Sequence, residues 1–451
     1  MNDTAPPPSR ALLLGAHLDD VTEQEFEESL AELRRLAITL GYEVVGRLTQ
    51  RRPSYDRAAY LGPGKVAELP ALVASAAGTD GGRVVLLVDH EITPSQARNL
   101  EKAAGAEVLD RTAVILEIFH RHARSRQAKA QVEMVRLAYM APRMREQAHA
   151  NKGDRVRGGV GGKGAGESGL ELDRRKIRDR IAELKDELSR IESERTTQRA
   201  RRRDLHRVAL VGYTNAGKST LMRALTGSEV YVADKLFATL DTTVRALEPP
   251  THPRILVSDT VGFIRKLPHD LVASFKSTLD EALEASLILQ VVDASDPAHP
   301  RQMAATDEVL TEIGAGDVPR LRVFNKVDRI ADPEAIALIV ASHGRMADRS
   351  EDPASGGRGR TVADGHPGAL VVSAKRPDDV QRVRAAIVSF FEGAFVDGEL
   401  LLPHHRQALR GEIFDRCHVL DESSDERGTT FRLRATPEEL ERLRRRAAGR
   451  A

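Results

Sequence analysis

One segment of the 451-residue sequence restricts the fold more than any other. Residues 212–219 read Gly-Tyr-Thr-Asn-Ala-Gly-Lys-Ser and directly follow the apolar run Val208–Val211. A strand that ends in G-x-x-x-x-G-K-[ST] and continues into a helix is typical of a phosphate-binding loop, in which backbone N–H groups, a lysine and a hydroxyl surround a phosphate. The helix-forming residues 221–225 complete this pattern. The segment therefore predicts a phosphate site rather than a simple glycine-rich turn.

Three further motifs follow apolar runs in the order that a guanine-nucleotide site requires. Asp259–Gly262 (Asp-Thr-Val-Gly) offers a carboxylate that reaches Mg²⁺ through water and a glycine amide that senses the γ-phosphate. Asn325–Asp328 (Asn-Lys-Val-Asp) offers a carboxylate that accepts two hydrogen bonds from the guanine edge, a donor pair that adenine lacks. Ser373–Lys375 places a backbone amide where it could meet the guanine O6. Together the four motifs predict a GTP-binding domain.

The stretch Phe237–Thr243 resembles a switch and holds three candidate threonine ligands for Mg²⁺, among which spacing alone does not choose. The predicted site residues are Gly212, Tyr213, Thr214, Asn215, Ala216, Gly217, Lys218 and Ser219 for the phosphates, with Ser219 also on Mg²⁺; Phe237, Ala238, Thr239, Leu240 and Asp241 in switch I; Asp259, Thr260, Val261 and Gly262 in switch II; and Asn325, Lys326, Val327, Asp328, Ser373, Ala374 and Lys375 for guanine.

Phe263 stands directly after the Asp-x-x-Gly motif, where Ras-like enzymes have a glutamine that orients the attacking water. Because phenylalanine cannot orient water, we expect slow intrinsic hydrolysis that a partner accelerates. Asn215 offers one local substitute, since its amide oxygen could hold a monovalent cation such as K⁺ against the phosphates. The alternative is that Asn215 only stabilises the turn.

The charge of the chain is concentrated in one region. Residues 121–207 contain 24 Lys and Arg against 13 Asp and Glu, in a chain whose net charge is +1. Apolar residues from Ile177 to Ile191 step by four and three, a seam of about two heptads, and a second helical stretch lies near Val132–Met144. These features predict a basic helical hairpin around the Gly-rich segment 151–169, which is either a solvated surface or a grip for a polyanion. Its candidate RNA contacts are Lys152, Arg155, Arg157 and Lys163.

Alternating strand and helix patterns on either side of the hairpin predict an α/β fold. We expect an N-terminal α/β domain (1–121), the basic hairpin (122–204), a doubly wound GTP-binding domain (205–394) and a small C-terminal α+β domain (395–451). Residues 342–368 are predicted to be a disordered insertion. No apolar window is long enough to cross a membrane, and the single cysteine excludes an internal disulfide, so we expect a cytoplasmic protein.

The sequence resembles the HflX family of ribosome-associated GTPases. The resemblance rests on Tyr60–Leu69, Asp110–Phe119, the Gly-rich loop from Gly158, and above all Gly262-Phe-Ile-Arg-Lys-Leu-Pro-His-Asp-Leu271 running into Val291–Pro297. It implies Thr239 as an Mg²⁺ ligand and binding to the large ribosomal subunit, with dissociation or rescue of stalled ribosomes. Thr242 stands where the family usually has proline, and the Gly-rich loop lacks the usual proline and glutamine.

Three interpretations of function follow. In the first, a monomeric GTPase binds GTP or GDP with Mg²⁺ and grips the RNA of the large ribosomal subunit, partly associated with ribosomes. In the second, a GTP-dependent regulatory module binds a protein or another RNA. A third, an RNA-modifying enzyme timed by GTP, lacks a catalytic cysteine or a redox or methyl-donor motif outside the GTP-binding domain.

Overall fold

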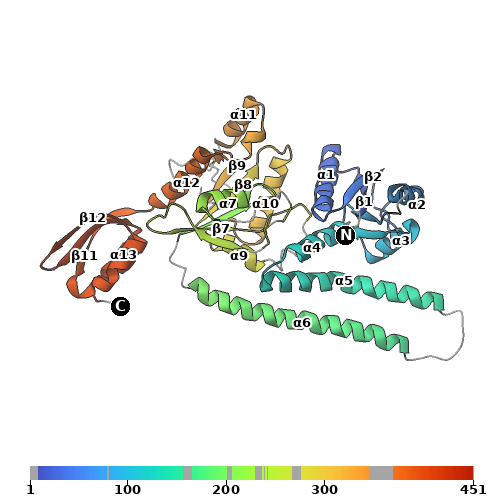
Figure 1. Cartoon of the computed structure of the whole chain (residues 1–451), viewed down its shortest axis with the longest axis horizontal. Coiled ribbons are helices and arrows are strands. Elements are labelled where there is room, and N and C mark those ends of the chain that lie inside the picture. Colours follow the sequence, from blue (N-terminus) through green and yellow to red (C-terminus); the bar gives the residue numbers. More distant parts are fainter. Residues whose placement is uncertain are drawn as a thin grey trace, which may run out of the picture. The chain divides into compact units, whose positions relative to one another are not determined.

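The computed structural model describes residues 9–449 except 79–80, 156–164, 201–205, 229–235, 238, 241, 267–275 and 345–368. The chain forms two compact units (Figure 1). The first unit comprises Met1–Glu194 together with the segments Lys235–Leu240 and Lys266–Phe275. The second unit comprises Arg195–Asp234, Asp241–Arg265 and Lys276–Ala451. One boundary between the units therefore falls inside the predicted switch I, between Leu240 and Asp241, and another falls three residues after the predicted switch II, between Arg265 and Lys266.

The first unit is built on a four-stranded parallel sheet in the order β2-β1-β3-β4, which confirms the predicted α/β fold. Its strands are β1 (Arg10–Leu18), β2 (Glu43–Arg52), β3 (Val84–Val88) and β4 (Glu107–Asp110). The helices that connect and follow them are α1 (Glu23–Thr39), α2 (Pro63–Ala77), α3 (Pro94–Ala104) and α4 (Arg111–His122). All five residues of β3 are buried, as expected for a central parallel strand covered on both faces.

Local signals in the sequence set the ends of these helices. Thr22 and Thr93 each form a capping box with the residue three positions later, and Pro94 occupies the first turn of α3. Gly105 ends α3 in the left-handed conformation, at φ 65°. Asp110 accepts from the backbone N–H of Ala113 and caps α4 at the carboxyl end of β4.

Two long helices, α5 (Arg126–Arg155) and α6 (Ala165–Ala200), form the predicted hairpin (Figure 1). Arg126 pairs with Glu187 and Glu133 pairs with Arg180, so the two helices run antiparallel. Leu184 is 1% exposed, and the other apolar seam positions of α6 are half-buried. The heptad pattern thus marks the buried side of α6.

The second unit holds a six-stranded sheet in the order β10-β9-β8-β5-β7-β6. Its strands are β5 (His206–Gly212), β6 (Thr243–Ala246), β7 (Ile255–Asp259), β8 (Leu287–Asp293), β9 (Arg320–Asn325) and β10 (Ala369–Val371). Its helices are α7 (Lys218–Thr226), α9 (Lys276–Leu283), α10 (His299–Glu312), α11 (Pro333–Gly344), α12 (Pro377–Glu392) and the 3₁₀ turn η1 (Val327–Arg329). The apolar runs that precede the four motifs form β5, β7, β9 and β10, which are parallel to one another and to β8, and this confirms the doubly wound sheet.

Two details of this unit differ from the predictions. β6 is an antiparallel edge strand that includes Thr243, so this candidate Mg²⁺ ligand is part of a β-ladder. Residues 342–344 belong to α11 rather than to the predicted insertion, because the helix continues past its apolar stretch; residues 345–368 lie outside the described residues.

The C-terminal part of the second unit is a three-stranded antiparallel sheet in the order β11-β13-β12, with two helices and a 3₁₀ turn. Its elements are β11 (Val396–Pro403), η3 (His404–Leu409), α13 (Arg410–Arg416), β12 (His418–Asp425), β13 (Gly428–Ala435) and α14 (Pro437–Ala447). Phe431 and Leu433 are fully buried with Leu443 and Cys417, so this part has its own apolar core.

Candidate GTP-binding site

Close backbone approaches explain the two glycines of the loop between β5 and α7. A Cβ atom at Gly212 would lie 2.1 Å from the carbonyl oxygen of Val291, on the neighbouring strand β8. A Cβ atom at Gly217 would lie 2.2 Å from Nδ2 of Asn325, and Gly217 has φ +97°. Any larger residue would push the loop away from β8 and β9. The glycines thus hold the loop against the strand ends that carry the other motifs.

Lys218 is the buried cation of this loop. Its Nζ donates to the carbonyl oxygens of Gly212 at 3.0 Å and Tyr213 at 2.9 Å. Burial lowers the pKa of Lys218 to about 8, against the effect of the nearby Asp259 carboxylate, which raises it. An ammonium held in a low-dielectric loop is a strong partner for phosphate oxygens, because water does not screen it.

Ser219 and Asp259 form the part of the site that suits a divalent metal. The Ser219 hydroxyl donates to Oδ2 of Asp259 at 2.7 Å, and Asp259 is fully buried at the end of β7. Within the described residues, no group of three or more His, Cys, Asp or Glu side chains is arranged to hold a metal ion. A hydroxyl with one carboxylate nevertheless fits Mg²⁺, which binds a few hard protein oxygens and completes its shell with water and substrate phosphates. Bound there, Mg²⁺ would neutralise phosphate charge.

Asn325 joins the phosphate loop to the base-binding loops. Its Nδ2 donates to the carbonyl oxygen of Ala216 at 2.9 Å, and its Oδ1 accepts from the backbone N–H of Ala374 at 2.9 Å. Asn325 is 2% exposed, so both groups of the amide are used inside the protein. This side chain therefore holds three motifs together.

Asp328 lies at the point where the sequence predicts guanine recognition. Its Oδ1 accepts from the Ser373 hydroxyl at 2.7 Å, and its Oδ2 lies 3.7 Å from Nζ of Lys375. The hydrogen bond from Ser373 lowers the pKa of Asp328 below its usual value. The carboxyl group is therefore ionised and accepts hydrogen bonds, as recognition of the guanine edge requires.

Two residues that support the base-binding loops were not predicted. Asp293, at the end of β8, binds Nζ of Lys326 at 2.7 Å, and Lys326 has the left-handed φ of 64°. Asp379 accepts from the backbone N–H of Ser373 at 2.8 Å. Asp293 directly follows the apolar run of β8, and this position could have been used to predict its role. No sequence signal pointed to Asp379, because its side chain binds the backbone of a motif rather than a ligand.

The segment after Gly262 is hydrogen-bonded to the phosphate loop. The backbone N–H of Phe263 donates to the Gly212 carbonyl at 3.1 Å, and the Phe263 carbonyl accepts from the N–H of Thr214 at 2.7 Å. The N–H of Arg265 donates to the Tyr213 hydroxyl at 2.7 Å. The Phe263 side chain is 2% exposed. The residue that replaces the water-orienting glutamine therefore packs inside the protein.

Of the remaining predicted site residues, two of switch II are buried and one of the phosphate loop is exposed. Thr260 Oγ1 donates to the Leu210 carbonyl at 2.8 Å, and Val261 is buried. Asn215 is exposed with φ 61°, a conformation that asparagine tolerates in turns. Its role at a monovalent cation stays a prediction.

The described residues of switch I belong to the first unit. The carbonyl oxygen of Phe237 lies 2.8 Å from Nδ1 of His122, and the ring packs edge-on against Phe119 with centroids 4.6 Å apart. Leu240 is buried and Thr239 is half-buried; Ala238 and Asp241 lie outside the described residues. That Thr239 binds Mg²⁺ therefore stays a prediction.

Only two of the four candidate RNA contacts fall in a described helix. Lys152 and Arg155 belong to the last turn of α5, and their side chains lie outside the described residues. Arg157 and Lys163 fall wholly outside them. None of the four predictions is tested by side-chain geometry.

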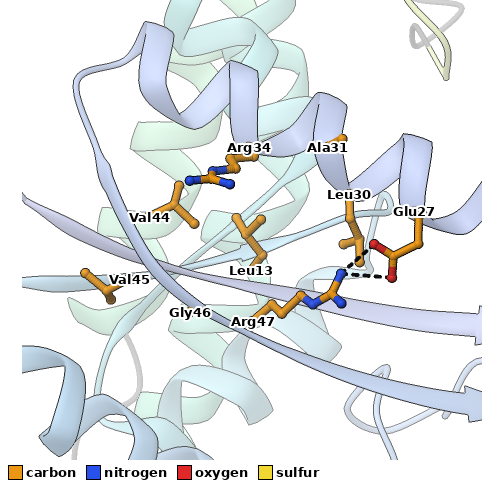
Figure 2. Close-up of a pocket in the computed structure, with 9 residues that line it drawn as sticks. All are labelled: Leu13, Glu27, Leu30, Ala31, Arg34, Val44, Val45, Gly46 and Arg47. Atoms are coloured by element: carbon orange, nitrogen blue, oxygen red, sulfur yellow. Dashed lines mark hydrogen bonds and ion pairs between the residues drawn. The ribbon is translucent and has the colours of Figure 1, made fainter. Parts of the chain in front are cut away.

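A separate cavity of about 350 Å³ lies in the first unit between α1 and β2 (Figure 2). Leu13 and Leu30 line it, and Arg47 donates two hydrogen bonds to Glu27 at 2.8 and 2.6 Å. The close-up shows Arg34 reaching from α1 over the cavity. No residue of the GTP motifs lines this cavity, so it is distinct from the nucleotide site.

A parallel sheet with a phosphate loop, a hydroxyl–carboxylate pair and an Asn-Lys-x-Asp loop at its strand ends defines the P-loop GTPases. Family models agree: residues 27–120 match "GTP-binding GTPase N-terminal", residues 122–202 match "GTP-binding GTPase Middle Region" and residues 207–326 match "50S ribosome-binding GTPase".

Full-length relatives narrow the class to one family. The chain is 50% identical to GTPase HflX of Gluconacetobacter diazotrophicus, over 99% of this chain and 100% of the relative. It is 38% identical to GTPase HflX of Caldanaerobacter subterraneus over 98% and 95%, and 36% identical to that of Escherichia coli over 90% and 89%. The chain belongs to the HflX family of GTPases and is a GTP hydrolase. No helix in the described part of the chain is long and apolar enough to span a membrane.

Proposed function

We propose that the chain binds the large ribosomal subunit in its GTP-bound form, dissociates or rescues stalled ribosomes, and is released after hydrolysis. The observation that carries the proposal is the net charge of residues 121–207, 24 Lys and Arg against 13 Asp and Glu. The match of residues 207–326 to a family described as 50S ribosome-binding GTPases supports the same partner.

The contacts of the hairpin support RNA as its ligand. Among the described residues, Glu133 and Glu187 are used in ion pairs between α5 and α6, with Arg180 and Arg126. Acidic residues are therefore partly neutralised within the hairpin, and the excess of cations remains for an outside partner. An RNA phosphate backbone is such a partner, and each phosphate contact adds about 0.7–0.9 to the salt dependence of binding.

Mg²⁺ is the proposed cofactor, held by Ser219 and Thr239 together with the phosphates. The hydrogen bond between Ser219 and the buried Asp259 supports Ser219 as a ligand. A K⁺ ion at Asn215 is the proposed source of extra positive charge during hydrolysis. Equal GTP turnover in K⁺ and Na⁺ buffers would contradict this role. Because Phe263 is buried and cannot orient water, we propose that the ribosome accelerates hydrolysis.

Cosedimentation tests the proposal. The full chain is centrifuged with 50S subunits, 30S subunits and 70S ribosomes in a non-hydrolysable GTP analogue or in GDP. We expect binding to 50S subunits in the analogue and weaker binding in GDP, with free 50S and 30S subunits appearing from 70S ribosomes. The same gradients report whether the free chain sediments as a monomer. No subunit binding in either nucleotide would overturn the proposal and favour a module for another RNA or a protein.

A charge-matched pair of variants isolates the hairpin. The test variant replaces Lys152, Arg155, Arg157 and Lys163 with glutamine. The control replaces four exposed cations elsewhere with glutamine, namely Arg34, Lys102, Arg245 and Arg427. If the hairpin contacts RNA, the test variant loses up to about 3 units of salt slope and the control loses none. Equal losses would show that the effect follows net charge alone.

A further inference from the structure

A buried ion cluster in the first unit joins three elements. Nη1 of Arg111 donates to Oδ1 of Asp89 at 2.7 Å, and Nη2 of Arg111 donates to Glu32. Arg111 is 1% exposed and both carboxylates are 4% exposed. Two buried carboxylates share one guanidinium, so the formal net charge of these three side chains is −1. Such a charge in a low-dielectric interior is strongly unfavourable unless a cation compensates it.

Lys266 supplies that cation. Its Nζ donates to the Ser29 hydroxyl at 3.2 Å and to the Asp89 backbone carbonyl at 3.1 Å, and lies 3.4 Å from Oδ2 of Asp89. With Lys266 in place, two positive and two negative charges balance. Burial, and then the Lys266 ammonium, lower the pKa of the neighbouring His90. The cluster therefore favours Lys266 at this position.

Lys266 follows directly on the segment that contacts the phosphate loop. Arg265 belongs to the second unit and donates its backbone N–H to Tyr213, whereas Lys266 belongs to the first unit by its contacts. A peptide bond thus joins a residue that the phosphate loop holds to a residue that the ion cluster holds. Movement of the segment 262–265 with the γ-phosphate must strain or release the lysine.

The same cluster is next to the anchor of the basic hairpin. Asp110, the residue before Arg111, accepts from the Tyr139 hydroxyl at 2.6 Å and from Nη2 of Arg143 at 2.8 Å, both on α5. Asp110 is 2% exposed and also accepts from the N–H of Ile92. A shift of Arg111 therefore moves the carboxylate that holds α5.

We propose that Lys266 is a positioning residue, which ties the segment after Gly262 to the Asp89–Arg111–Glu32 cluster and relays the nucleotide state through Asp110 to α5. The inference rests on the proposed function, in which the nucleotide sets the pose of the basic hairpin. It assigns that control to one lysine and to a chain of buried hydrogen bonds.

Hydrogen exchange of the full chain, without ribosomes, tests the proposal. Deuterium uptake is measured in peptides of α5 around Tyr139, with saturating GTP analogue or GDP. We expect the opening equilibrium of α5 to differ about fivefold or more between the two nucleotides. Lys266→Met should abolish this difference while the affinity for each nucleotide stays within about threefold, because Lys266 does not belong to the GTP motifs. Lys266→Arg, which keeps the charge, should restore the difference.

Lys65→Met is the matched control. Lys65 has a similarly exposed side chain, 35% against 41%, and forms a surface ion pair with Glu68 at 2.9 Å. This variant should keep the difference between nucleotides. The proposal is overturned if the unmodified chain shows no difference in α5, or if Lys266→Met keeps it. A clear difference in α5 without binding to 50S subunits would overturn the proposed function and leave the relay standing.

Discussion

In both sheets the order of the parallel strands reverses direction, between β1 and β3 in the first unit and between β5 and β8 in the second. Ligands of open α/β sheets bind outside the carboxyl ends of the strands at this point. In the second sheet, the phosphate loop that begins at Gly212 lies at this point and includes Lys218. In the first sheet this point is occupied by Asp89, whose carboxylate is bound by Arg111 and Lys266 of the same chain.

The two sheets differ in whether the charged groups at their strand ends are neutralised by other groups of the same chain. The first sheet satisfies its strand-end carboxylates internally, with Arg111, Lys266 and Arg143. The second sheet holds its polar groups in place with internal hydrogen bonds, yet Asp328, its predicted base-binding carboxylate, is ionised and at the surface. A strand-end position alone therefore does not define a ligand site. The comparison predicts that mutations cost ligand affinity in the second sheet and folding stability in the first.

The largest effect should come from Asp328→Asn. The amide cannot accept both hydrogen bonds from the guanine edge, so GTP affinity should fall by about 10⁴-fold. Its new N–H donor matches the oxygen that xanthine carries at that edge, so xanthosine triphosphate should gain affinity. Competition binding with both nucleotides measures the change. Unchanged discrimination between them would remove Asp328 from base recognition.

Arg111→Met should produce the largest loss of stability. It leaves the buried Asp89 and Glu32 without their shared guanidinium, which costs about 3–5 kcal/mol. The free energy of unfolding of the first unit can be followed by tyrosine fluorescence, since the chain has no tryptophan.

Arg47→Met is the control for Arg111→Met. The pair of Arg47 with Glu27, seen in Figure 2, is about half exposed on both sides. Its removal should cost less than about 1 kcal/mol, because solvent screens the charges. Similar costs for Arg47→Met and Arg111→Met would contradict the internal role of the Arg111 cluster.

The sequence predicts the position of a site residue where a chemical motif directly follows an apolar run. Each GTP motif follows an apolar run, so the places of Gly212, Asp259 and Asn325 at strand ends could be predicted. The edge strands β6 and β12 could not be predicted. None of the four residues of β6 is buried, and β12 is mostly exposed with a polar sequence that lacks the alternation of a half-buried strand. The contact of Lys266 with Asp89 spans 177 positions, and no local pattern encodes such a distance.

A pH effect of intermediate size should separate the two sheets further. The pKa of Lys218 is lowered to about 8 by burial, whereas bound phosphate favours its charged form and raises that pKa. Binding therefore takes up a proton above about pH 8, and affinity should fall by about tenfold from about pH 7 to about pH 9. Titration calorimetry in two buffers measures the proton uptake. Lys218→Ala lacks the titrating amine, so its pH dependence reports only the other ionisable groups. The proton uptake assigned to Lys218 should be absent in this variant.

Tyr139→Phe should give the smallest effect, confined to the first unit. The substitution removes the hydrogen bond to Oδ1 of Asp110 at 2.6 Å but keeps the ring under Arg143, whose Cζ lies 3.5 Å from the ring centroid. Asp110 keeps its other donors, so we expect a loss of about 1 kcal/mol in the unfolding free energy and unchanged GTP affinity. Tyr42→Phe, at another partly buried tyrosine of this unit, is the control and should cost less. If Tyr139→Phe instead weakened GTP binding severalfold with no loss of stability, the division of labour between the two sheets would be wrong, because the anchor of α5 would then contribute to nucleotide affinity rather than to folding stability.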